Sequence, residues 1–219
     1  MLSPKSRSNL FVASVMLSCM NFQIGYAQQA HALFSDEKQI TEMYGQITEG
    51  RNVLPKTVLD AFIASQEASP IKIFPESPEL TYQLVNRSMP ASLRGEAGIT
   101  TIRQQTALIS GALTQDEIAN WYAQTVYLGN ECYGVRDAAY AYFFSELDDL
   151  SLSKVALLAT LPRRPSFYTN NANQSKTIED RNLILDRMLL NGTISAVDAN
   201  AAKLEGVAWR HPLRHCQQK

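Results

Sequence analysis

The sequence predicts a mainly α domain built from short helices. Apolar residues recur at helical spacing, as in the series Val135, Ala138, Ala139, Tyr142 and Phe143. A capping box, Thr114 with Glu117 three residues later, marks one helix start. No segment keeps the alternation of apolar and polar residues that is typical of a strand. These observations favour packed helices over a sheet.

The sequence predicts fewer helices in the first half of the chain than in the second. We expect a helical stretch near residues 37–46 and a helix opened by Pro55, whose missing N–H costs nothing in a first turn. Residues 71–97 contain three prolines and no clear period, so we expect mostly loop there. A further helix is expected over 98–110, entered through Thr100 or Thr101.

The second half predicts a series of closely spaced helices. The capping box opens the first, Gly129 and Gly134 bracket a tight turn, and an apolar helix follows over 135–143. The segment 151–161 is so apolar that we expect a central helix, ended by prolines. The last two helices are expected over 181–191 and after Ser195, where each has a suitable cap; we expect the segment 207–219 to be a disordered tail.

The N-terminus is typical of a secretory leader. Lys5 and Arg7 precede a short apolar run, and Gly25-Tyr26-Ala27 suits a cleavage site. We therefore expect a signal peptide over 1–27 and an exported protein, in the periplasm or at the outer face of the cytoplasmic membrane. A short membrane anchor and lipoprotein processing at Cys19 are the alternatives. The expected domains are then a polar lead-in over 28–52 and one domain over 53–206.

Charge and cysteine usage restrict the partners. The net charge is -1 with no basic stripe, so we expect no nucleic-acid partner. Removing residues 1–27 takes away two of 20 basic residues and none of 21 acidic ones, which leaves a net charge of −3. This charge disfavours constant residence on an anionic membrane surface.

Cys132 and Cys216 can form a disulfide in an exported protein, or remain unrelated thiols. No Cys/His cluster has metal-ligand spacing, and we expect no cofactor.

Several motifs occur in one order along the chain. Val53-Leu54-Pro55 opens a helix that leads to Ala64-Ser65, and the run Gly98-Ile99-Thr100-Thr101-Ile102-Arg103-Gln104-Gln105 follows. Further matches come between Thr114 and Pro165, at Gly129, Gly134, Ala138-Ala139, Tyr142-Phe143 and Leu161-Pro162, and then at Arg181-Asn182 and Arg187-Met188. Together they resemble the peptidoglycan glycosyltransferase domain, family 51, of class A penicillin-binding proteins and monofunctional transglycosylases. The resemblance covers about Val53 to Leu204 and implies a lysozyme-like, mainly α fold.

The resemblance also implies a substrate and a chemistry. Family members polymerise lipid II, and a Glu acts as general base on the acceptor sugar while basic residues and a second Glu manage the pyrophosphate leaving group. By resemblance, Gln66 and Glu67 stand at the catalytic positions, and Thr100, Thr101, Gln104, Gln105 and Gln124 at substrate-binding positions. The implied partners are lipid II or peptidoglycan strands, other cell-wall enzymes and the membrane surface.

The chain departs from the family pattern where the chemistry lies. The base position holds Gln66, and a carboxamide cannot accept a proton at neutral pH. Glu67 is adjacent, but neighbouring helical residues point about 100° apart. Leu108 replaces a family Lys, and the family's R-K-x-x-E segment is missing between Ser110 and Thr114.

The sequence leaves three readings open. The first is a glycosyltransferase-like envelope protein with weak or no activity. The second is a non-catalytic module that binds peptidoglycan or a partner. The third is a lysozyme-like lytic enzyme that uses Glu67, Glu96 or Glu131 as its general acid.

Overall fold

The computed structural model describes residues 34–67, 79–88, 96–209 and 216. In this part of the chain the protein is helical, and its one β feature is an isolated antiparallel bridge between Tyr127 and Tyr133. The prediction of a mainly α fold is therefore confirmed. The expected leader over 1–27 lies outside the described residues. None of the described helices is long and apolar enough to cross a bilayer.

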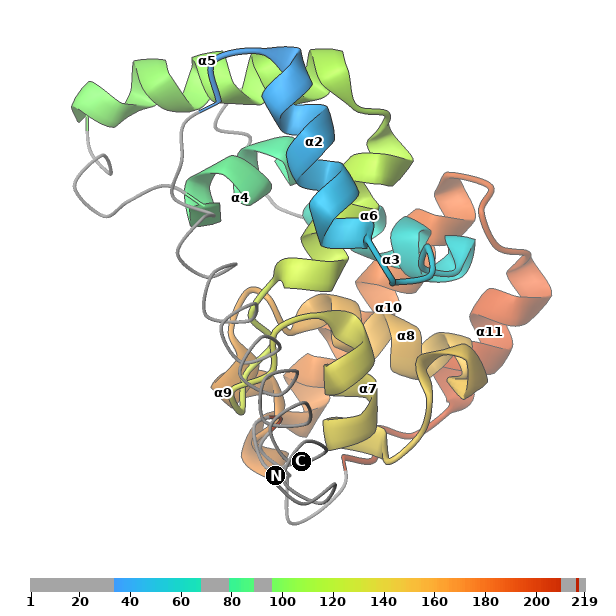
Figure 1. Ribbon diagram of the computed structural model, residues 1–219. Helices are drawn as coiled ribbons and strands as arrows, with labels where there is room; N and C mark the ends of the chain where they lie inside the picture. The colour runs from blue at the N-terminus through green and yellow to red at the C-terminus, as the bar shows by residue number, and fades with distance from the viewer. Residues whose placement is uncertain (1–33, 68–78, 89–95, 210–215, 217–219) are drawn as a thin grey trace, which may run out of the picture.

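Figure 1 shows the described helices and their labels. In chain order they are α2 (Glu37–Thr48), α3 (Lys56–Glu67), α4 (Glu79–Ser88), α5 (Glu96–Ala112), α6 (Gln115–Thr125), α7 (Val135–Phe143), η2 (Leu147–Asp149), α8 (Leu152–Thr160), α9 (Pro165–Tyr168), η3 (Asn171–Asn173), α10 (Gln174–Leu190) and α11 (Ala196–Leu204).

Two groups of helices meet at α3. On one side α3 packs against α8 and α10, and α11 covers α10 and α8. On the other side α3 packs against α6, and α5 lies across α2 and α4 at the top of Figure 1. The apolar face of α3 explains its central place, because Val58, Leu59 and Phe62 are each almost fully buried. The predicted central helix over 151–161 is likewise confirmed as α8, in which Val155 through Thr160 are buried.

Local sequence signals explain most helix ends. The Thr114 side chain accepts a hydrogen bond from Glu117 N, and the Glu117 carboxylate accepts one from Thr114 N, so the predicted capping box is confirmed. Ser195 caps α11 in the same way, by accepting a hydrogen bond from Asp198 N. Gly192 follows α10 with φ 69°, in the left-handed region that glycine adopts without strain.

Three expectations about local structure were wrong. Residues 79–88, expected as loop, form α4, because the prolines of this region flank the helix and Leu80, Leu84 and Val85 supply a buried face. Helix α5 begins at Glu96, before Thr100. The tail from residue 207 is not disordered throughout, since Val207 and Trp209 are buried and Cys216 is held by a disulfide.

The segment that ends at Thr48 is part of the packed domain. Ile40 and Ile47 of α2 are buried against α5 and α6, and the ring of Phe34 packs edge-on against Trp121 with centroids 5.9 Å apart. The polar residues of α2 that motivated the prediction of a lead-in form its exposed side. A helix over 37–46 is confirmed, with a slightly longer span.

Candidate functional site

Gln66 lies in the last turn of α3. Its side chain is buried, and its Nε2 donates a hydrogen bond to Ser65 Oγ at 3.0 Å. Ser65 Oγ in turn donates to the carbonyl of Phe62 at 2.8 Å. The amide is thus held by its own helix, and it contains no group that could accept a proton from a substrate hydroxyl. Glu67 ends the same helix, and its side chain lies outside the described residues.

Gln105 acts as a clamp on the N-terminal segment. Its Oε1 accepts a hydrogen bond from Phe34 N at 2.7 Å, and its Nε2 donates to Phe34 O at 2.9 Å. Both polar ends of the amide are therefore used on one backbone unit 71 residues away. The neighbouring Gln104 and Thr100 are exposed on α5, and Thr101 is half-buried. Substrate binding by Gln105 stays a prediction from the resemblance; in the structure its amide bonds to the Phe34 backbone.

Gln124 belongs to a buried network that joins three segments. Its Nε2 donates to Asn120 Oδ1 at 3.0 Å, and the same oxygen accepts from Leu54 N at 3.1 Å. Asn120 Nδ2 donates to the Tyr44 hydroxyl at 3.1 Å. Burial raises the pKa of Tyr44 and the hydrogen bond from Asn120 opposes this, so the phenol remains neutral at physiological pH. The network fixes α6 against α2 and against the entry to α3.

The described site residues that the sequence predicts lie on helices with different packing partners. Helix α3 packs against α6, α8 and α10, whereas α5 packs mainly against α2 and α4. Figure 1 places the N-terminal end of α5, which carries Thr100 and Thr101, at the far edge of the molecule from α3. The physical reason is the clamp at Gln105, which together with the packing of α4 fixes the direction of α5. Gln66 and Gln124 lie on two helices that pack against each other.

The junction between α5 and α6 is direct. Helix α5 ends at Ala112 and α6 begins at Gln115, so only Leu113 and the capping residue Thr114 connect them. Leu113 N still donates to Ile109 O at 3.0 Å, which prolongs the first helix into the turn. The segment expected here from the family pattern has no counterpart in the structure. Leu108, at the family's Lys position, is half-buried and packs against the core.

A shallow pocket of about 400 Å³ lies at this junction, between α4, α5 and α6. It is lined mainly by Leu80, Leu113 and Ile118, together with Thr81, Ser110, Thr114 and Gln115. Ser110 Oγ donates to Thr81 Oγ1 at 3.2 Å, so two of the hydroxyl groups satisfy each other. None of the described lining residues has an ionisable side chain, so these residues offer no acid, base or cation for sugar transfer.

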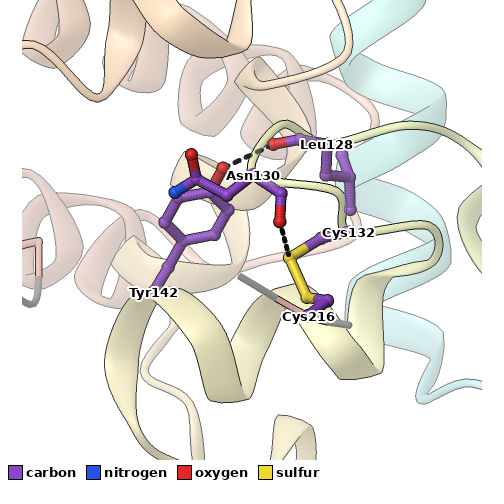
Figure 2. Close-up of a disulfide and its surroundings, with 5 residues drawn as sticks. All are labelled: Leu128, Asn130, Cys132, Tyr142 and Cys216. Carbon is purple, nitrogen blue, oxygen red and sulfur yellow. Dashed lines mark hydrogen bonds between the residues drawn. A yellow bond between two sulfur atoms is a disulfide. The ribbon is translucent and has the colours of Figure 1, made fainter. Parts of the chain in front are cut away.

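Backbone conformation and steric contacts require glycine at two positions of the turn between α6 and α7. Gly129 and Gly134 have φ values of 90° and 89°, and a Cβ on Gly134 would meet the Gln124 carbonyl oxygen at 2.5 Å. Cys132 lies inside this turn and is bonded to Cys216, so of the two alternatives left open by the sequence the structure has the disulfide. Figure 2 shows Cys216 seated beside the turn, where its N donates to Asn130 O at 3.2 Å.

Two other features matter for the proposed chemistry. Glu131, the described candidate for a general acid, is exposed in the glycine turn, as expected of a surface carboxylate. Arg103 is exposed on α5, away from the buried network. Within the described residues no group of three or more His, Cys, Asp or Glu side chains could hold a metal ion.

Sequence reasoning missed the most deeply buried charge. Arg181 has no exposed surface, and it donates to Ser153 Oγ at 2.9 Å, to Lys203 O at 2.9 Å and to Glu205 O at 2.5 Å. It fastens α10 to α8 and to the end of α11. Burial lowers the pKa of its guanidinium, which nevertheless remains charged at neutral pH. Its match to the family motif is therefore explained by packing.

Comparisons with known proteins identify the family to which this chain belongs. A model of the family described as Transglycosylase matches residues 80–189, half of the chain. The chain belongs to the transglycosylase family. Over 99 residues it is 41% identical to penicillin-binding protein 1A of Pseudomonas aeruginosa, covering 45% of this chain and 12% of that protein. Over 200 residues it is 26% identical to penicillin-binding protein 1A of Escherichia coli, covering 80% of this chain and 23% of that protein.

A solved structure is also similar to this transglycosylase-family chain. The crystal structure of penicillin-binding protein 1A from Haemophilus influenzae is 26% identical, with a TM-score of 0.45, over 71% of this chain and 17% of that one. The chain spans less than a quarter of the length of these penicillin-binding proteins.

Proposed function

We propose that this chain is a cell-envelope protein that binds lipid II or peptidoglycan strands and polymerises them weakly or not at all. The observation that carries the proposal is Gln66. By resemblance it stands at the position of the family's catalytic Glu, and its Nε2 donates a hydrogen bond to Ser65 Oγ. Without a carboxylate there, the acceptor hydroxyl has no base to take its proton.

The direct junction of α5 and α6 supports the same proposal. The missing R-K-x-x-E segment would carry the cations that hold a pyrophosphate and the second Glu. Leu113 and Thr114 alone connect the two helices, and the described residues that line the pocket beside them are not ionisable. Adding a base at position 66 would therefore leave the leaving group unassisted.

Retention of the scaffold supports a binding role. The amides of Gln105 and Gln124 and the guanidinium of Arg181 keep the helices in place, although the groups that would perform the transfer are absent. A fold kept without its chemistry suits a module that holds the family's substrate, or a partner enzyme, in the periplasm or at the outer face of the cytoplasmic membrane.

Binding of fluorescently labelled lipid II to the purified chain tests the proposal. We expect saturable binding that unlabelled lipid II displaces. Undecaprenyl phosphate, which lacks the sugars of lipid II, serves as the control. The proposal requires that the chain recognise the glycan part. Absence of saturable binding, or equal displacement by the control lipid, would contradict the proposal.

A further inference from the structure

The two cysteines of the Cys132–Cys216 disulfide differ in accessibility. Cys132 has no exposed surface, whereas Cys216 is half-buried at the edge of the core. A thiolate that opens a disulfide must reach one of its two sulfur atoms, and access helps to decide which sulfur is attacked. The proposed binding of glycans makes no use of this bond, so its chemistry is a separate property of the chain.

The backbone of Cys132 is fixed on both sides. Its N donates to Gly129 O at 2.8 Å and closes a four-residue turn, in which Asn130 and Glu131 have φ values of 47° and 60°. Positive φ at both central residues is the mark of a tight hairpin turn. The carbonyl oxygen of Cys132 accepts a hydrogen bond from Leu128 N at 2.9 Å. Cys132 therefore cannot turn outward unless this hairpin opens.

The surroundings of the two cysteines also differ. The Asn130 carbonyl oxygen lies 3.5 Å from the Cys132 sulfur, as Figure 2 shows. The partial negative charge of this oxygen disfavours the approach of an anionic thiolate to that sulfur. Cys216 is joined to the turn through one backbone hydrogen bond, from its N to Asn130 O at 3.2 Å. Access and electrostatics thus both direct an incoming thiolate to Cys216.

The leaving group has the opposite effect. Attack at Cys216 expels the sulfur of Cys132 as a thiolate, and burial disfavours a charged sulfur. This makes the exchange slow, but it does not redirect the attack, because the alternative requires contact with a residue that has no exposed surface. The fixed backbone also keeps the released Cys132 beside Cys216, where it can attack in turn.

We propose that Cys216 is the site at which a low-molecular-mass thiol enters this disulfide, and that Cys132 is the resolving cysteine. In the first step the small thiolate forms a bond to Cys216 Sγ, the bond between the two cysteines breaks, and Cys132 leaves with the electron pair. In the return step the Cys132 thiolate attacks Cys216 Sγ and expels the small thiolate. The exchange opens the covalent link between the C-terminal segment and the turn before α7, and it can restore that link.

Mapping the mixed disulfide formed with reduced glutathione tests this assignment. The full chain carries Cys19→Ser, so that Cys132 and Cys216 are its two cysteines. The oxidised protein is mixed with glutathione and quenched with acid at early times, and free thiols are alkylated in denaturant. Mass spectrometry of the tryptic peptides then shows which cysteine carries glutathione and which was alkylated. The control is the same reaction in urea that unfolds the chain, where both sulfur atoms are accessible.

In the folded chain we expect glutathione on Cys216 with alkylated Cys132, in at least about tenfold excess over the reverse pattern, which is a difference of about 1.4 kcal/mol in activation free energy. In urea the two patterns should be nearly equal. Glutathione mainly on Cys132, equal amounts on both residues of the folded chain, or no adduct on either overturns the proposal. An excess that persists unchanged in urea also overturns it, because the preference would then come from the local sequence.

Discussion

The Gln105 side chain holds the backbone of Phe34 through two hydrogen bonds, one in each direction, at 2.7 and 2.9 Å. By resemblance this glutamine belongs to a substrate-binding motif, yet its amide is used for joining the N-terminal segment to α5. The same pattern occurs at Gln124 and Arg181, whose polar groups bind other parts of the chain. These three residues, which match the family pattern, thus hold parts of the scaffold together.

Replacement of Gln105 tests this structural role. Gln105→Leu leaves the N and O of Phe34 without their partners, and we expect a loss of about 2 kcal/mol in the free energy of unfolding. Gln104→Leu is the matched control, because Gln104 is exposed and is adjacent on the same helix. Urea unfolding of both variants measures the difference. Equal stability of the two variants would show that the clamp contributes nothing.

The contact between Gly134 and Gln124 predicts a steric effect. A Cβ at Gly134 would lie 2.5 Å from the Gln124 carbonyl oxygen, and the residue has φ +89°. Gly134→Ala therefore combines backbone strain with a clash, and we expect destabilisation of at least about 3 kcal/mol. Gly192→Ala separates the two terms, because Gly192 has φ +69° and nothing within 4 Å. That variant should lose only about 1 kcal/mol. Thermal unfolding measures both, and similar losses would argue against the clash.

The Cys132–Cys216 disulfide should stabilise the oxidised protein. It closes a loop with a sequence separation of 84 residues and ties down the segment that includes Trp209. Reduction should lower the free energy of unfolding by about 2–4 kcal/mol. It should also change the fluorescence of Trp209, whose ring stacks on Phe143 with centroids 5.4 Å apart.

The double variant Cys132→Ala with Cys216→Ala controls for other effects of the reductant. Its unfolding midpoint in urea should equal that of the reduced parent, and added dithiothreitol should not change it. A parent whose midpoint is insensitive to reduction would contradict a stabilising role of this disulfide.

Two buried tyrosines predict instability in alkali. Burial raises the pKa of Tyr142 far above its ordinary value of 10.0, and burial and then the hydrogen bond to Asp180 raise that of Tyr168. Above pH 10 the unfolded chain loses these phenolic protons while the native state keeps them. Stability is therefore unaffected below about pH 10 and falls above it, by up to about 1.4 kcal/mol per pH unit for each group.

Tyr142→Phe checks the assignment. The variant loses the hydrogen bond that the hydroxyl donates to Leu128 O, so it should be less stable at pH 7. Its stability should then fall less steeply than that of the parent between pH 10 and 11.5, as measured by urea unfolding at each pH. An unchanged slope would mean that Tyr142 does not titrate differently in the two states.

Much of the fold could be predicted from the sequence because its signals are local. The capping box at Thr114, the apolar period of α7 and the glycine turn each specify structure within a few residues. Helix α4 was missed because nearby prolines obscured the short apolar face of Leu80, Leu84 and Val85. The order at Trp209 and Cys216 could not be foreseen, since it depends on contacts with α7 and with a cysteine 84 positions earlier.

The candidate site was harder to predict than the fold. A motif gives residue types, but it does not say whether the amide of Gln105 faces a ligand or the Phe34 backbone. That choice depends on the tertiary position of α2, which the polar sequence of 28–52 did not indicate.

Polymerisation of lipid II by the purified chain tests the central claim most directly. Glycan chains are resolved on a gel, with a catalytically intact family member as the positive control and Gln66→Glu as a second sample. We predict no chains from the parent, and none from Gln66→Glu, since the segment between α5 and α6 is absent as well. Chains from Gln66→Glu alone would place the whole defect at the base. Robust chain formation by the parent would contradict the account.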